Sequence, residues 1–217
     1  MHTIRVWDLP TRLFHWALVL CIIGLTISGQ WGGEALVWHF KLGYTTLTLL
    51  LFRCVWGFVG GRWSRFVHFV RGPRGILQYL RGSADAPSSV GHNPLGALSV
   101  LGLLLLILIQ VLTGLISDDE IAASGPWVAH VSNAWVLQAS KYHAHIGKWI
   151  LGGLVGLHLL AIAFYQWKKR QPLVRAMLTG DKAVDQAAPE SQDSLATRLL
   201  ALALFVGCAA LVAYAVT

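Results

Sequence analysis

The sequence predicts an all-α membrane protein whose helices cross the lipid bilayer. Of its 217 residues, 55% are hydrophobic and only 12% are charged, whereas a soluble domain carries about 25% charged residues. The apolar residues gather in five long runs, at 13–30, 40–60, 95–117, 143–166 and 196–216. Each run reaches or approaches the roughly 20 residues that a helix needs to span the hydrocarbon core. We therefore expect a core of four transmembrane helices followed by a fifth, C-terminal one.

The composition of the connectors predicts the domain organisation. A stretch rich in Pro, Ser, Asp and Gln separates the last apolar run from the others, and such a composition is typical of a linker. We predict a four-helix transmembrane domain over 1–182, a polar linker over 183–194 and an additional transmembrane helix over 195–217. The stretch 63–80 mixes arginines with apolar residues and is expected to lie along the membrane surface.

The basic residues indicate how the chain is oriented. The formal net charge is +7, and 14 of the 17 Lys and Arg residues lie near the start of the chain, at 53–81 or at 168–198. Because cytoplasmic loops carry the excess of Lys and Arg, this pattern places the N-terminus in the cytoplasm and, after five spans, the C-terminus outside. The positive charge therefore reports membrane topology, and no nucleic-acid partner is expected.

Several kinds of chemistry are excluded by the motifs that the sequence lacks. Cys21, Cys54 and Cys208 are isolated within apolar runs, and the absence of C-x-x-C-H excludes a covalently attached c-type haem. The sequence also contains no H-E-x-x-H, no phosphate-binding glycine loop and no G-x-S-x-G. A hydrolase or a nucleotide-dependent enzyme therefore has no support.

Histidines inside the apolar runs are the strongest functional signal, because ionisable residues in lipid are costly and are usually functional. His15 enters the first run at its cytoplasmic end, and His158 lies at a comparable depth in the fourth. His39 opens the second run at the outer face, where His143 and His145 open the fourth. The depths predict two pairs, one near each leaflet, and helical bundles supply the two axial imidazoles of a haem iron in this way.

Helical phase favours His143 over His145 as the outer member of the fourth helix. His143 lies 15 residues before His158, and His145 lies 13 residues before it. At about 100° per residue, the first separation is about 60° from in line and the second is about 140°. We prefer His143 as the outer ligand and keep His145 as the alternative.

Cations near the helix ends are candidate partners of the haem propionates. Arg53 and Lys148 stand in otherwise apolar surroundings, and Arg12, Lys41 and Lys141 lie near the same interfaces. The competing interpretation is that these side chains extend to lipid headgroups. A function from a different class is also open, namely a haem-free transporter whose histidines relay protons or bind a metal ion.

Six stretches of the sequence resemble the bacterial cytochrome b561 family, which includes the b-type cytochrome subunits of nickel hydrogenases. They include VWDLPTRLFHW, HFKLGY, GHNPLG and LVRAMLTG, and the remaining two are 53–60 and 65–73. The resemblance covers about residues 3–182. It implies a four-helix core with two haems b, the inner one held by His15 and His158 and the outer one by His39 and a histidine that opens the fourth helix. The family tends to space its two fourth-helix histidines by 14, where this chain has Ala144.

The resemblance also implies a function and a location. It indicates an electron carrier of the bacterial inner membrane that works between the quinone pool, ubiquinone or menaquinone, and a periplasmic partner. That partner would be a c-type cytochrome or a hydrogenase, and association into a homodimer is a further expectation. Because some members are thought to oxidise superoxide with quinone as the acceptor, a superoxide:quinone oxidoreductase is the alternative of the enzyme class.

Overall fold

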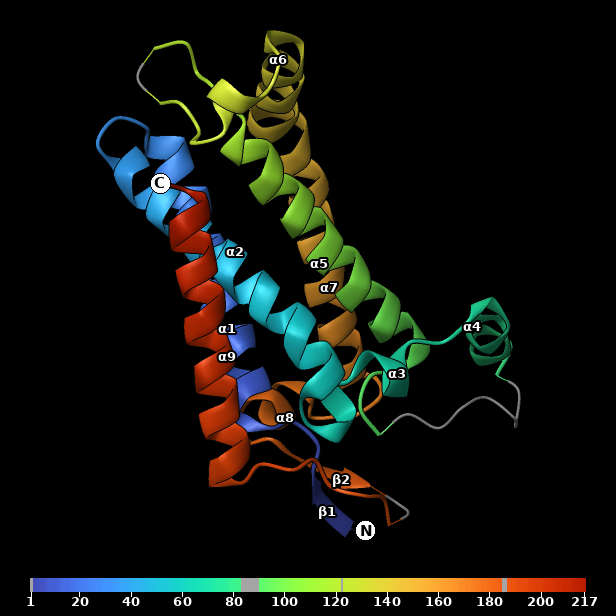
Figure 1. Ribbon diagram of the computed structural model, residues 1–217. Helices are drawn as coiled ribbons and strands as arrows, with labels where there is room; N and C mark the ends of the chain where they lie inside the picture. Colours follow the sequence, from blue (N-terminus) through green and yellow to red (C-terminus); the bar gives the residue numbers. More distant parts are fainter. Residues whose placement is uncertain (1, 83–89, 122, 185–186) are drawn as a thin grey trace. The chain divides into compact units, whose positions relative to one another are not determined.

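The computed structural model describes residues 2–82, 90–121, 123–184 and 187–217 and is mostly α-helical (Figure 1). Five helical stretches are long and apolar enough to cross a membrane. They are α1 (Leu9–Trp31), α2 (Ala35–Val59), α5 (Pro94–Leu115), the stretch Asn133–Trp167 and α9 (Leu195–Ala215). The predicted fold class, an all-α membrane protein with five spanning helices, is confirmed.

Shorter elements connect or extend these helices. They are β1 (His2–Arg5), η1 (Arg62–Ser64), α3 (Phe66–Phe69), α4 (Pro73–Leu80), η2 (Val128–His130), α6 (Asn133–Lys141), η3 (Tyr142–Gly147), α7 (Lys148–Trp167), α8 (Leu173–Thr179) and β2 (Asp181–Val184). Two differ from expectation. The fourth apolar helix begins at α6, ten residues before its predicted start, and the strands were not predicted at all. The predicted linker begins inside β2, and its residues 185 and 186 lie outside the described residues.

The long helices expose large apolar side chains to their surroundings. Leu20 in α1 is 69% exposed, Phe58 in α2 is 73% exposed and Leu160 in α7 is 70% exposed. Soluble monomers rarely expose contiguous apolar surface on this scale. These faces therefore fit contact with lipid, in which the backbone polar groups of a helix remain satisfied internally.

Two compact units make up the chain, and each long helix except α5 is divided between them near one of its ends. The first unit comprises Met1–Phe14, Arg53–Gly102 and Leu157–Ala203. The second comprises His15–Phe52, Leu103–Gly156 and Leu204–Thr217. In the first unit, β1 and β2 pair antiparallel, with His2 opposite Val184 and Arg5 opposite Asp181 (Figure 1). This sheet ties the start of the chain to the segment that follows α8.

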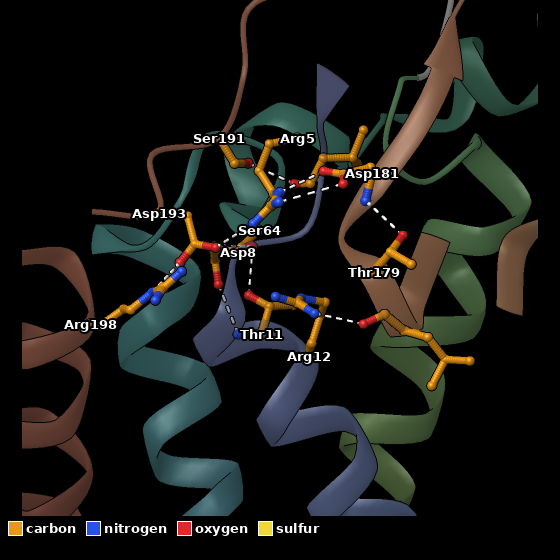
Figure 2. A network of polar contacts seen from close by, with 12 residues as sticks. Arg5, Asp8, Thr11, Arg12, Ser64, Thr179, Asp181, Ser191, Asp193 and Arg198 are labelled. Atoms are coloured by element: carbon orange, nitrogen blue, oxygen red, sulfur yellow. Dashed lines mark hydrogen bonds and ion pairs between the residues drawn. The ribbon is translucent and has the colours of Figure 1, made fainter. Parts of the chain in front are cut away.

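Asp8 is the centre of a buried polar network in the first unit (Figure 2). The side chain is 0% exposed. Its Oδ1 accepts hydrogen bonds from Thr11 N (2.8 Å) and Trp56 Nε1 (3.2 Å). Its Oδ2 accepts from Gly61 N (3.1 Å) and Ser64 Oγ (2.9 Å). Asp8 thus caps the N-terminus of α1 and joins it to the end of α2 and to η1.

Ion pairs fasten the segment before α9 to the same unit (Figure 2). Arg5 pairs with Asp181 (2.6 Å) and with Asp193 (2.8 Å), and Asp193 also pairs with Arg198 at the start of α9 (2.9 Å). In the second unit, Phe205 of α9 lies edge-on to Phe52 with ring centroids 6.1 Å apart. The helix added beyond the four-helix core is therefore held by contacts in both units.

Candidate functional site

The second unit brings His39 of α2 and His143 of η3 together. Their ring centroids are 6.0 Å apart and their planes are almost perpendicular, at 89°. Two imidazoles bound on opposite sides of one metal, each through a bond of about 2 Å, have centroids about 6 Å apart. The spacing of this pair is therefore the spacing that a shared iron requires.

Backbone carbonyls fix the orientation of both rings. Nδ1 of His39 lies 3.1 Å from the carbonyl oxygen of Leu25 in α1, and Nδ1 of His143 lies 2.8 Å from that of Gln110 in α5. Because a carbonyl oxygen can only accept, each Nδ1 must carry the proton and each Nε2 is left with its lone pair. Metal-binding histidines are usually oriented by such a contact, which also raises their basicity. The two histidines therefore fit the chemistry of axial haem ligands.

Two glycines let these rings lie against the neighbouring helices. A Cβ added at Gly29 of α1 would come within 3.1 Å of Cε1 of His39, and one added at Gly114 of α5 would come within 2.7 Å of Cε1 of His143. Real Cβ atoms essentially never approach to the second of these distances. The place of the His143 ring therefore depends on the absence of a side chain at Gly114.

A π-helical turn separates the roles of the two histidines that open the fourth helix. Both lie in η3, a six-residue π-helix, but His143 is half-buried beside His39 whereas His145 is exposed. A π-turn closes i→i+5 bonds and so holds one residue more than an α-helical turn. Counted along the helix, the 15 residues from His143 to His158 then advance like 14 α-helical residues. The structure thus places His143, and not His145, beside His39.

The inner pair, His15 and His158, is divided between the two units. His158 belongs to the first unit, where its Nδ1 lies 3.4 Å from Ser99 Oγ of α5. His15 belongs to the second unit and lies edge-on to the Trp16 ring, with centroids 5.0 Å apart. Both are half-buried. Their pairing remains a prediction from the sequence.

The two predicted propionate partners have different surroundings. Arg53 is only 3% exposed, its Nη2 donates to the carbonyl oxygen of Ser64 (3.0 Å), and its guanidinium lies 4.8 Å from the centroid of Phe66. It is therefore held inside the first unit and does not extend to headgroups. Lys148 is exposed, with Nζ 5.8 Å from the centroid of the Trp149 ring.

The other candidate cations are placed as follows. Nη1 of Arg12 donates to the carbonyl oxygen of Leu178 (2.6 Å), and Nζ of Lys41 lies 4.9 Å from the centroid of Trp38. Lys141, the last residue of α6, is exposed. A role for any of these cations at a propionate remains a prediction.

Sequence reasoning missed the groups that orient the outer pair. Leu25 takes part through its carbonyl oxygen, so its side chain gives no signal in the sequence. Gln110 does give one, because an amide in the middle of the apolar run 95–117 is unfavourable unless it is hydrogen-bonded. A search for every polar residue in the spans, beyond the ionisable ones, would have found it.

A membrane protein whose helices present opposed imidazoles, each with its Nδ1 fixed, has the architecture of a membrane-bound haem protein. Comparison with known proteins agrees with this class. The family of prokaryotic cytochrome b561 matches residues 6–180. The chain belongs to this family, which makes it a b-type cytochrome, a haem-containing membrane protein of electron transfer.

Similar proteins are found in several bacteria. A probable Ni/Fe-hydrogenase B-type cytochrome subunit of Bradyrhizobium diazoefficiens is 25% identical, over 83% of this chain and 86% of its own length. A probable Ni/Fe-hydrogenase 1 B-type cytochrome subunit of Escherichia coli K12 is 26% identical, over 71% and 80% respectively. A similarly described subunit of Cupriavidus necator is 27% identical, over 81% and 85%.

Proposed function

We propose that this chain is a dihaem cytochrome that carries electrons between the quinone pool and a periplasmic redox partner. The outer haem b is held by His39 and His143, and the inner one by His15 and His158. The observation that carries the proposal is the outer pair, whose ring spacing of 6.0 Å and Nδ1 contacts both suit ligation of one iron through Nε2.

The protein's part in this function is to hold and tune the iron, which supplies the one-electron chemistry by alternating between its ferrous and ferric states. The carbonyl oxygens of Leu25 and Gln110 hold the two outer imidazoles in the tautomer that binds metal. Arg53, buried near the end of α2, is the proposed partner of an inner propionate, and Lys148 that of an outer one. Each cation would stabilise the charged carboxylate that it faces.

The relatives suggest the partner. Because they are described as probable subunits of Ni/Fe-hydrogenases, a hydrogenase is the partner that we propose, ahead of a c-type cytochrome. We also propose that the protein lies in the bacterial inner membrane with its N-terminus in the cytoplasm. The electrostatics after α2 support this side: burial, followed by the charges of Arg62, Arg65 and Arg71, lowers the pKa of His68, as expected in a strongly positive cytoplasmic loop.

Haem counting in three single variants tests the proposal. We expect the purified wild-type chain to contain two haems b, with absorption bands that sharpen on reduction by dithionite. His39→Ala and His143→Ala should each remove the outer haem, while His145→Ala, two residues further along the same turn, should keep both. A wild-type protein without porphyrin would refute the function, and a full haem content in His143→Ala would refute the ligand assignment.

The partner is tested separately with membranes that contain the hydrogenase. If the proposal is correct, hydrogen gas should reduce the haems of the wild-type chain in these membranes and should not reduce them when the hydrogenase is absent. Reduction that is independent of the hydrogenase would refute this partner and leave the haem assignment untouched.

A further inference from the structure

Gln110 of α5 contacts His143 in two places, in opposite directions. Its side-chain Nε2 donates to the backbone carbonyl oxygen of His143 at 2.9 Å. In return, Nδ1 of the His143 ring donates to the backbone carbonyl oxygen of Gln110 at 2.8 Å. One residue of α5 thus fixes both the backbone and the side chain of one residue of η3.

The surroundings of this double contact are shaped to admit the amide. Gly147, the last residue of η3, is buried, and a Cβ added there would meet Oε1 of Gln110 and also the ring of Tyr142. Gly114, one turn along α5 from Gln110, makes room for the His143 ring in the same way. The contact therefore uses small residues on both helices, at the positions where any side chain would block it.

The conformation that the contact stabilises decides which histidine faces His39. A π-helical turn is rare and carries one residue more than an α-helical turn. If η3 relaxed to an α-helix, the residues before it would rotate by about 100° relative to α7. That rotation would carry His143 away from His39 and change which residue of the turn lies nearest to it.

We propose that Gln110 is a positioning residue that holds η3 in its π-helical form and thereby selects His143, instead of His145, as the outer haem ligand. The proposal rests on the proposed function, since it concerns the second ligand of the outer haem. It assigns to Gln110 no contact with the haem itself. It predicts that the choice between the two histidines depends on an amide in a different helix.

The test compares Gln110→Met with Gln138→Met in the full-length protein. Methionine has a similar length to glutamine but no N–H donor, and Gln138 is an exposed residue of α6. We expect Gln110→Met to weaken retention of the outer haem by about tenfold or more. We also expect it to shift the outer haem's low-spin paramagnetic resonance signal and midpoint potential, while those of the inner haem stay unchanged. Gln138→Met should match the wild type in every respect.

A double variant separates ligand selection from general loosening. His145→Ala alone should change nothing, because His143 is the ligand. In the Gln110→Met background, His145 becomes available, so adding His145→Ala should remove the outer haem that Gln110→Met retains. If His145→Ala has no effect in either background, Gln110 does not select between the histidines and the proposal is overturned.

Gly147→Ala is a second route to the same result, for use if Gln110→Met does not fold. It keeps the amide but displaces it, and it should produce the same shift of the outer-haem signal. An outer-haem signal and potential unchanged in the folded variant would overturn the inference. The proposed function would stand in that event, provided that the wild type holds two haems and His143→Ala loses the outer one.

Discussion

Replacing Asp8 by Asn is expected to destabilise the first unit strongly, although the two side chains have almost the same shape. Both carboxylate oxygens are fully buried, and each accepts two hydrogen bonds. The asparagine side chain keeps one oxygen and puts an NH₂ group in place of the other. Two of the four donors would then face a donor.

The structure gives the size of the effect. A buried donor left without an acceptor costs about 1–3 kcal/mol, so two of them cost about 2–6 kcal/mol. The buried guanidinium of Arg53, which interacts electrostatically with Asp8, would also lose a compensating negative charge. Because whole proteins are stable by only about 5–15 kcal/mol, Asp8→Asn should remove a large part of the total.

Thermal unfolding followed by far-ultraviolet circular dichroism measures the loss. At about 2–4 °C per kcal/mol for a chain of this size, the midpoint should fall by on the order of 10 °C. Glu34→Gln, which removes the same charge from an exposed side chain, is the matched control and should leave the midpoint unchanged. If the two variants unfold at the same temperature, Asp8 is not the centre of a stabilising network and the reasoning fails.

Two further predictions concern the outer pair and the fifth helix. Gly114→Ala should push the ring of His143 aside and weaken outer-haem retention by about tenfold, whereas Gly207→Ala, which no described atom approaches within 4 Å, should not; equal haem contents would contradict the close contact. Burial alone would raise the pKa of Asp193, but hydrogen bonds, first of all from Arg198, lower it below its ordinary value of 3.8. Its contribution to stability is therefore present above that value and is lost as the pH falls through the lowered pKa, so unfolding midpoints of the wild type and Asp193→Asn should converge in acid; a constant difference at all pH values would refute this.

Much of the architecture could be predicted because its cause is local. Whether a stretch of about 20 residues spans lipid depends on the residues within it, so five apolar runs sufficed to predict the five helices. The depth of a histidine along a helix is also local, since the rise per residue is constant. Depth alone placed His39 and His143 at one level, and the structure brings these two rings face to face. Ligation by this pair remains a prediction.

The helix boundaries and the small sheet show where local reasoning ends. The segment 133–141 is polar enough to read as a connector, yet it is helical because it continues into η3 and α7. The strands β1 and β2 are four residues each, too short for an alternating pattern to distinguish them from loop. They form because the two ends of the core meet there, and contacts across the length of a chain leave no periodic signal.

The sequence by itself determined the membrane class, the number of spans and the residues able to bind iron, because hydropathy and residue chemistry are properties of single segments. Only the tertiary structure decided that His143 and not His145 lies beside His39, that Gln110 holds it, and that Asp8 joins segments as far as 56 residues apart. These choices depend on hydrogen bonds between helices, whose partners are selected by packing in three dimensions and not by the order of residues along the chain.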